Sequence, residues 1–351
     1  MGGLGLRTAQ DHAQAAYASS LLSCQPLVNQ LLHNPQEGLE DQQEDVIALS
    51  AELLADMKTR LGTEEEVTTE YLYGQNQKQI SAAIDLSNQQ CFSNEVQAAG
   101  EEREVARIKC LSLPHSGDWL NCSPIASLGL RIPPTEFILM IKYRLGMEVF
   151  ATAGPCPACH RHSDKLGDHA LNCGYSGERI SRHNLLRDAI HDVAAAAALN
   201  PVKEGRFLLP GADRRPADVF IRGWQGGQDV ALDVTVTNPL KDDTRVGAAV
   251  TPGHGACEAF DRKMRNSAAA CQAQGIAFLP LAVETFGGWH EVAVDQVKKL
   301  AVALARQNGQ EESEAIRHTW SRLGVLLQRG NAAMMANRIP TFPAAPTDGR
   351  E

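Results

Sequence analysis

Residues 217–236 have the sequence ADVFIRGWQGGQDVALDVTV, which predicts a β-hairpin. The first apolar run spans residues 217–222. The second, residues 229–236, alternates apolar with polar side chains and is rich in β-branched residues. Between them, Gly226-Gly227 is the kind of glycine pair that is found in tight turns. Two strands joined in this way are expected to be antiparallel neighbours.

The segments on either side extend this hairpin into a larger α/β unit. Before the hairpin, the spacing of apolar residues predicts a helix at residues 181–199 and a short strand at residues 206–209. After it, the sequence predicts a helix at residues 258–274 and, in an apolar run bounded by breaker residues, a strand at residues 276–284. Two further helices are predicted at residues 290–307 and 312–328. The resulting order is αβββαβ, followed by helices. Together with a helical N-terminal part, it predicts an α+β fold.

Four regions are expected along the chain. Residues 1–150 form a helical region with acidic loops, and residues 151–176 form a metal-binding knuckle. Residues 177–332 form the αβββαβ domain. The Pro/Ala-rich residues 333–351 form a disordered tail.

Charge and cysteine content restrict the function classes. The chain has a net charge of −9, but residues 1–110 hold 7 basic and 17 acidic residues, whereas the remainder holds 26 and 25. The total therefore does not exclude nucleic acid as a partner of the C-terminal part. No apolar run approaches the ~18 residues of a membrane span, and no secretory signal peptide is visible. In that context, an odd number of cysteines, nine, points to reduced thiols and metal ligation.

The strongest single motif is Cys156-x₂-Cys159-x₉-His169-x₃-Cys173. The first two cysteines share one tight turn, and His169 and Cys173, four residues apart, share one face of a helical turn. Four such ligands complete a closed tetrahedron, which is typical of structural Zn²⁺.

His160 and His162 are alternative ligands, but they lie close to the Cys159 turn, which favours His169. A closed zinc site holds structure and does not catalyse. Its use in function is to present Arg161 and Lys165 to a phosphate backbone.

The second motif is the pair Asp218 and Asp233, one on each strand of the hairpin. Antiparallel neighbours can bring both carboxylates to one spot, where they repel each other by about 3 kcal/mol at an effective dielectric constant of 20. Such a pair needs a cation or a shared proton. Oxygen ligands of this kind suit Mg²⁺ or Mn²⁺, which activates water for phosphodiester hydrolysis.

Other side chains extend this candidate site. Glu204, just before the expected first strand, is a third candidate ligand or base, and Glu284 competes with it for that role. Lys263, on the following helix, can orient the water or neutralise charge that develops on phosphate. Basic and polar residues at two places are expected to contact nucleic acid: Arg182, His183 and Asn184 at the start of the first helix, and Arg214 and Arg215 before the first aspartate.

Together these motifs resemble the C-terminal region of non-LTR retrotransposon proteins that carry a Cys-Cys-His-Cys knuckle and a restriction-like, PD-(D/E)xK endonuclease. The resemblance covers most of the chain and is strongest over residues 156–289. It rests on the knuckle, Arg182-His183-Asn184, Glu204, Pro216-Ala217-Asp218 and Asp233, with weaker likeness at Gly2-Gly3-Leu4-Gly5-Leu6, Trp119-Leu120 and Arg144-Leu145-Gly146.

The resemblance implies a function. In this family the two acidic strand residues bind the catalytic divalent ion, the nuclease nicks target DNA, and a reverse transcriptase copies RNA from the nick. Carried over, it implies that Asp218 and Asp233 are metal ligands and that Arg182 and His183 contact nucleic acid. It also implies a nuclear location and DNA, with element RNA, as partners.

The sequence departs from the family pattern at three points. Ala217 separates Pro216 from Asp218, and Thr235 stands where the family has a lysine, so we expect Lys263 to replace that lysine. No Tyr/Phe-x-Asp-Asp polymerase motif precedes Gly2, so the chain resembles the end of a longer protein. These departures keep two alternatives open: a zinc-stabilised nucleic-acid-binding remnant without cleavage, and a structural zinc protein.

Overall fold

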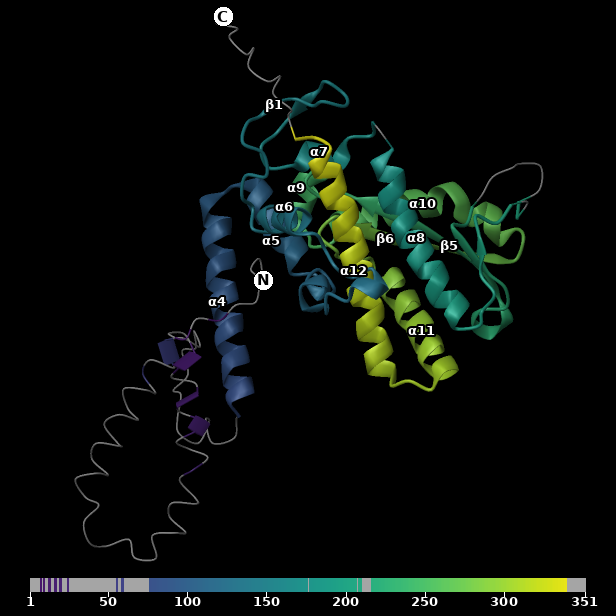
Figure 1. The fold of residues 1–351 in the computed structure, drawn as a ribbon, viewed down its shortest axis with the longest axis horizontal. Helices are drawn as coiled ribbons and strands as arrows, with labels where there is room; N and C mark the ends of the chain where they lie inside the picture. The colour runs from purple at the N-terminus through teal and green to yellow at the C-terminus, as the bar shows by residue number, and fades with distance from the viewer. Residues whose placement is uncertain are drawn as a thin grey trace, which may run out of the picture. The chain divides into compact units, whose positions relative to one another are not determined.

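The structure, a computed structural model, describes residues 76–175, 177–206, 208–209 and 216–339, with scattered positions between residues 7 and 59. The chain divides into two compact units, Leu4–Gly100 and Glu101–Glu351 (Figure 1). Helices dominate the described residues, and the strands form two small sheets. The predicted α+β class is confirmed.

The larger unit is built on a four-stranded sheet with the order β3-β4-β5-β6. Its strands are β3 (Val202–Lys203), β4 (Val219–Ile221), β5 (Asp229–Thr237) and β6 (Ile276–Glu284). β3 pairs with β4 in antiparallel orientation. β4 and β5 are also antiparallel, as the predicted hairpin requires. The last, β6, runs parallel to β5, which needs the helical crossover that the sequence places between them.

Helices cover both faces of this sheet (Figure 1). One face packs against α8 (Glu178–Ala196), α11 (Glu291–Asn308) and α12 (Glu312–Ala336). The other packs against α10 (His254–Gln272), which follows the short helix α9 (Arg245–Val250). Both faces are buried, and β6 is accordingly an almost continuous apolar run. β5 also carries the polar residues Asp233, Thr235 and Thr237 among its apolar ones.

Alternation along β5 assigns each side chain to one of these two layers. Leu232 and Val234 join the core beneath α8, α11 and α12, whereas Ala231 joins the core beneath α10. Asp233 shares the parity of Ala231. Its carboxyl group therefore belongs to the face that α10 covers.

Residues that precede the knuckle complete the unit. They form α5 (Glu102–Leu111), the 3₁₀ helices η1 (Asp118–Asn121) and η2 (Ala126–Leu128), and α6 (Pro134–Arg144). Trp119 and Tyr143 pack in one core with Phe286 and residues of α12. The sequence analysis grouped residues 101–150 with the N-terminal region. In the structure they belong with the αβββαβ domain, because their apolar side chains pack against residues far along the chain.

A two-stranded sheet and one helical turn form the knuckle. Its elements are β1 (Gly154–Pro155), β2 (His162–Ser163) and α7 (Asp168–Asn172). α7 packs on the end of α12, so the knuckle belongs to the larger unit.

In the smaller unit the structure describes α4 (Gln77–Ala99). Asn76 Oδ1 accepts the Gln79 N–H at 3.1 Å, and Gln79 Oε1 accepts the Asn76 N–H at 2.8 Å, which closes a capping box at the start of the helix. Ile80 and Ile84 are its buried apolar side chains. The part of the expected helical region before residue 76 falls mostly outside the described residues. The expected tail at residues 333–351 falls outside them from residue 340 onward, and its first residues belong to α12.

Two expectations for the sheet and its helices need correction. The short first strand lies at Val202–Lys203, not at residues 206–209, because Glu204 adopts a positive φ of 47° and ends the extended backbone there. The expected end of the domain at residue 332 falls inside α12, which continues to Ala336. Among the described helices none is both long and apolar enough to span a bilayer.

Candidate functional site

The four predicted zinc ligands converge. The ligand atoms of Cys156, Cys159, His169 and Cys173 all lie within 4.8 Å of one another. Cys156 Sγ lies 3.9 Å from Cys173 Sγ, and Cys159 Sγ lies 3.3 Å from His169 Nε2. Tetrahedral Zn²⁺ with Zn–S bonds of about 2.3 Å places sulfur ligands about 3.8 Å apart. The donor set therefore fits a closed Cys₃His zinc site, and His160 and His162 are not part of the group.

Local backbone structure presents these ligands. The Cys156 N–H donates to the Arg161 carbonyl at 2.8 Å, which closes the turn between the first two cysteines. Asp164 then holds the start of α7, because its two carboxylate oxygens accept the N–H groups of Asp168 and His169 at 3.1 and 2.8 Å. Burial lowers the pKa of His169, which favours the neutral imidazole that ligates metal.

The two predicted acidic residues also converge. β4 and β5 pair Val219 with Leu232, so Asp218, which directly precedes β4, lies near Asp233 of β5. The Asp218 N–H donates to the Leu232 carbonyl at 3.0 Å, which ties Asp218 to β5. Asp218 Oδ2 accepts the Val234 N–H at 2.6 Å, which fixes its carboxylate against the neighbouring strand.

Lys263 reaches the same place from α10. Its Nζ lies 2.7 Å from Asp233 Oδ2, and the Asp233 side chain is only 11% exposed. Burial raises the pKa of Asp233 to about 6; the nearby Asp218 carboxylate acts in the same direction and Lys263 in the opposite one. A buried carboxylate beside another carboxylate is a strong attractor for a cation.

His183, predicted to contact nucleic acid, instead contacts the acidic pair. Its Nε2 lies 3.0 Å from Asp218 Oδ1, and its side chain is 28% exposed. His183 lies one turn before Leu186, whose side chain is buried in the main core and anchors this part of α8. Asn184, the next predicted contact, is half-buried.

Arg182 differs from the expectation of a surface contact. It is 2% exposed and donates from Nη1 to Asn331 Oδ1 of α12 at 2.8 Å. Its position on α8 faces α12, so the guanidinium joins two helices. Arg214 and Arg215 lie outside the described residues.

The candidate third acids are held elsewhere. The Glu204 carboxylate forms an ion pair with Arg187 of α8, and it joins no cluster of three or more potential ligands among the described residues. Glu284 is fully buried, and its Oε1 accepts the Ala256 N–H at 3.3 Å in the first turn of α10. Its carboxylate therefore caps the start of α10.

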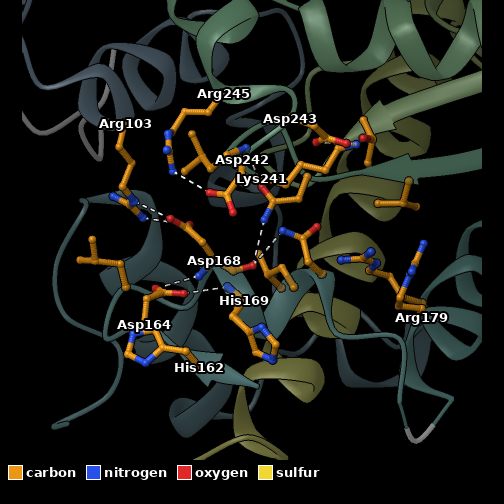
Figure 2. A pocket seen from close by; sticks show the side chains of 18 of the residues that line it. Arg103, His162, Asp164, Asp168, His169, Arg179, Lys241, Asp242, Asp243 and Arg245 are labelled. Carbon is orange, nitrogen blue, oxygen red and sulfur yellow. Dashed lines mark hydrogen bonds and ion pairs between the residues drawn. The ribbon is translucent and has the colours of Figure 1, made fainter. Parts of the chain in front are cut away.

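Two adjoining pockets open in this region, and the smaller one is lined by His183 and Lys263, which contact the acidic pair. The smaller one has a volume of about 330 Å³ and is also lined by Thr235. A larger one of about 950 Å³ lies between the knuckle and the carboxyl end of β5, and it shares Arg179 and Arg182 with the smaller one. Figure 2 shows this larger pocket, with Arg103 and Arg245 on one side and Arg179 on the other.

Charge in the larger pocket is mainly positive. Six basic and four acidic side chains line it. Arg103 is paired with Asp168 at 2.5 Å (Figure 2). Arg179 and Arg262 are exposed and form no ion pair with any described residue. Their unpaired guanidinium groups are therefore available to bind the phosphates of a nucleic-acid backbone.

Sequence reasoning missed Arg179 and Arg262. Arg262 adjoins Lys263, and Arg179 lies in the first turn of α8, so each was within reach of the motifs. The sequence gives no sign, however, that the knuckle and the carboxyl end of β5 face each other across one pocket.

Comparisons of the chain with protein-family models and with curated proteins find no match.

Proposed function

We propose that this chain is a divalent-metal-dependent DNA endonuclease of a retroelement-derived protein. The observation that carries the proposal is the position of Asp218 near Asp233, with Lys263 Nζ 2.7 Å from Asp233 Oδ2. The buried Asp233 of β5, the half-buried Asp218 just before β4 and one lysine from the crossover helix are the groups that phosphodiester hydrolysis by a metal-activated water needs.

The donor set suits Mg²⁺ or Mn²⁺. Mg²⁺ is usually held by one or two carboxylates, retains several waters and takes further ligands from substrate phosphates. Asp218 and Asp233 supply two carboxylates, and each carboxylate oxygen retains a lone pair beyond its present hydrogen bond. When bound, such an ion polarises a phosphoryl oxygen and makes a bound water a better nucleophile at neutral pH.

The protein residues have separate tasks in this proposal. Asp218 is held in place by the Val234 N–H and by His183, so one ligand is preorganised before substrate arrives. Lys263 orients the attacking water or neutralises charge on the scissile phosphate. A substrate phosphate weakens its ion pair with Asp233 by competing for the ammonium group.

The nucleic acid follows the larger pocket. Arg179 lines both pockets, Arg262 lines the larger one, and residues of the knuckle form a wall of the larger one. The zinc site thereby acts on DNA indirectly, because it gives this wall its shape. A nuclear location and element RNA as a second partner follow from the same proposal.

A zinc-held nucleic-acid-binding remnant is the second candidate. It is favoured by Thr235, which supplies no charge where a lysine is expected, and by the ion pair that draws Glu204 to Arg187. Under this alternative the pocket and the knuckle still bind nucleic acid, but the acidic pair does not cleave.

Nicking of supercoiled plasmid distinguishes the two candidates. The full chain, loaded with zinc, is incubated with plasmid in Mg²⁺, in Mn²⁺ or in a weak chelator that leaves the zinc bound, and DNA binding is measured in parallel. The endonuclease produces open circles only with the divalent ion. Binding without nicking in any metal supports the remnant, and absence of both binding and nicking contradicts both candidates.

A further inference from the structure

Arg338 is the largest fully buried side chain of the described residues. It lies two positions beyond the end of α12 and is 0% exposed. A guanidinium remains charged at any physiological pH, and burial of a charge is costly unless partners compensate it. The surroundings of Arg338 must therefore supply negative charge and hydrogen-bond acceptors.

Part of that compensation comes from the chain between the knuckle and α8. Arg338 Nη2 donates to the Tyr175 carbonyl at 2.8 Å and to Glu178 Oε2 at 3.0 Å. Nη1 donates to the Met334 carbonyl at 2.9 Å. A guanidinium has five N–H donors, and the buried Nε has no partner within hydrogen-bond geometry among the described residues.

The remaining partner is a zinc ligand. The Arg338 guanidinium lies beside the Cys173 thiol, which is only 4% exposed and lies 3.9 Å from Cys156 Sγ. Tyr175, whose carbonyl accepts from Arg338 Nη2, follows Cys173 by two residues, so the guanidinium is held at this end of the knuckle.

The net charge of a zinc-loaded knuckle also makes Arg338 a suitable partner for Cys173. Zn²⁺ bound to three thiolates and one neutral imidazole carries a net charge of −1, and this charge is costly at a site where Cys156 and Cys173 are buried. Metal sites of this kind depend on hydrogen bonds to their ligands from the surrounding protein. Among the described residues, Arg338 combines complete burial with direct proximity to a ligand sulfur.

We propose that Arg338 supports the zinc centre: its guanidinium donates to the Cys173 thiolate, offsets the negative charge of the Zn–Cys₃His complex, and joins the knuckle to the start of α8 through Glu178. The same residue thereby links zinc occupancy to the position of the helix that carries His183. The inference depends on the zinc site alone and holds whether or not the acidic pair cleaves DNA.

Metal release and a metal spectrum test this proposal in the full chain. Zinc transfer to a chromophoric chelator is followed for the wild type, Arg338→Lys and Arg338→Met. Release is expected to be about tenfold or more faster in Arg338→Met, in line with the loss that follows removal of a ligand's hydrogen-bond partner. Arg338→Lys, which keeps the charge and one donor, is expected to be intermediate.

Co²⁺ substitution separates this role from simple packing. A hydrogen bond lowers the energy of the sulfur lone pair, so its loss shifts the sulfur-to-cobalt charge-transfer band to longer wavelength in Arg338→Met. Glu178→Gln removes the ion pair but leaves the donor to sulfur, so its band stays at the wild-type position.

Arg107→Met is the matched control. Arg107 is also buried, at 2% exposure, but it pairs with Glu104 and the Arg144 carbonyl away from the knuckle. Its loss is expected to lower stability without moving the band. If Arg338→Met does not fold, Arg338→Lys decides the question. Wild-type release and an unmoved band in the folded Arg338 variants overturn the proposal.

Discussion

Lys263 Nζ lies 2.7 Å from Asp233 Oδ2, although one residue belongs to a helix and the other to the strand before it. Thr235, two residues after Asp233, shares its face of β5, and α10 covers that face. A lysine on α10 can therefore reach the point that a lysine at residue 235 would reach. The location of the ammonium group in the folded chain, and not the number of the residue that carries it, determines whether it can contact the acidic pair.

A lysine swap tests this equivalence. Lys263→Met is expected to reduce metal-dependent nicking by about 100-fold or more, because it removes the cation beside the acidic pair. Adding Thr235→Lys to that variant is expected to restore part of the rate, which single-turnover nicking measures. Arg265→Met, on an exposed position of the same helix, serves as the control and should leave the rate unchanged. An unaltered rate in Lys263→Met contradicts its assigned role.

Loss of a zinc ligand should destabilise the knuckle. Cys159→Ser is expected to abolish zinc binding, because serine is a poor ligand for zinc, and to lower the temperature of unfolding as well as DNA affinity. Zinc content per chain and thermal unfolding check this prediction. Cys257→Ser, an exposed cysteine on α10, is the matched control and should keep its zinc. Full zinc content in Cys159→Ser would show that the four residues do not form the site.

Glu284 should make stability depend on pH. Burial raises its pKa from the ordinary value of 4.5 to about 7, so the folded state binds the proton more tightly than the unfolded state. The stability that this group contributes is present below pH 4.5 and is lost as pH rises through 7.

Glu284→Gln removes that pH dependence. Glutamine keeps the acceptor for the Ala256 N–H and carries no charge, so at pH 8 the variant is expected to be more stable than the wild type by up to about 3 kcal/mol, at about 1.4 kcal/mol per tenfold change in proton affinity. Urea unfolding at pH 5 and pH 8 measures the difference. Glu314→Gln, at an exposed position of α12, is the control. A variant that is less stable than the wild type at pH 8 contradicts this prediction.

Arg179 and Arg262 should each contribute one phosphate contact. Arg179→Gln and Arg262→Gln are expected to weaken DNA binding and to reduce the slope of log affinity against log salt by about 1 each. Fluorescence anisotropy at several salt concentrations gives that slope. Lys298→Gln, on an exposed position of α11, should leave it unchanged. Equal slopes in all four proteins would place the nucleic acid elsewhere.

Local sequence patterns were sufficient for most elements. β6 has the bounds that its apolar run predicted, and the zinc ligands and the aspartate pair follow from spacing and from the hairpin. These features depend on residues close together in the chain, or on a register that the tight turn fixes.

Features set by long-range packing were not predictable in this way. Arg182 looked like a surface residue because nothing in α8 shows that α12 covers that side. His183 was assigned to DNA because its distance from Asp218 depends on how α8 packs on the sheet. The short helix α9 and the buried Arg338 are further cases, since both acquire their partners only when the two ends of the domain meet.

Nicking by Asp233→Asn is the most direct test of the proposed active site. The rate of first-strand nicking in Mg²⁺ is compared for the zinc-loaded full chain, Asp233→Asn and Asp229→Asn, which is the same change on the same strand at a residue that accepts the Gly223 N–H. We expect a loss of at least about 100-fold in Asp233→Asn, with DNA binding retained, and a wild-type rate in Asp229→Asn. A wild-type rate in Asp233→Asn would contradict the assignment of this pair as the metal site of a nuclease.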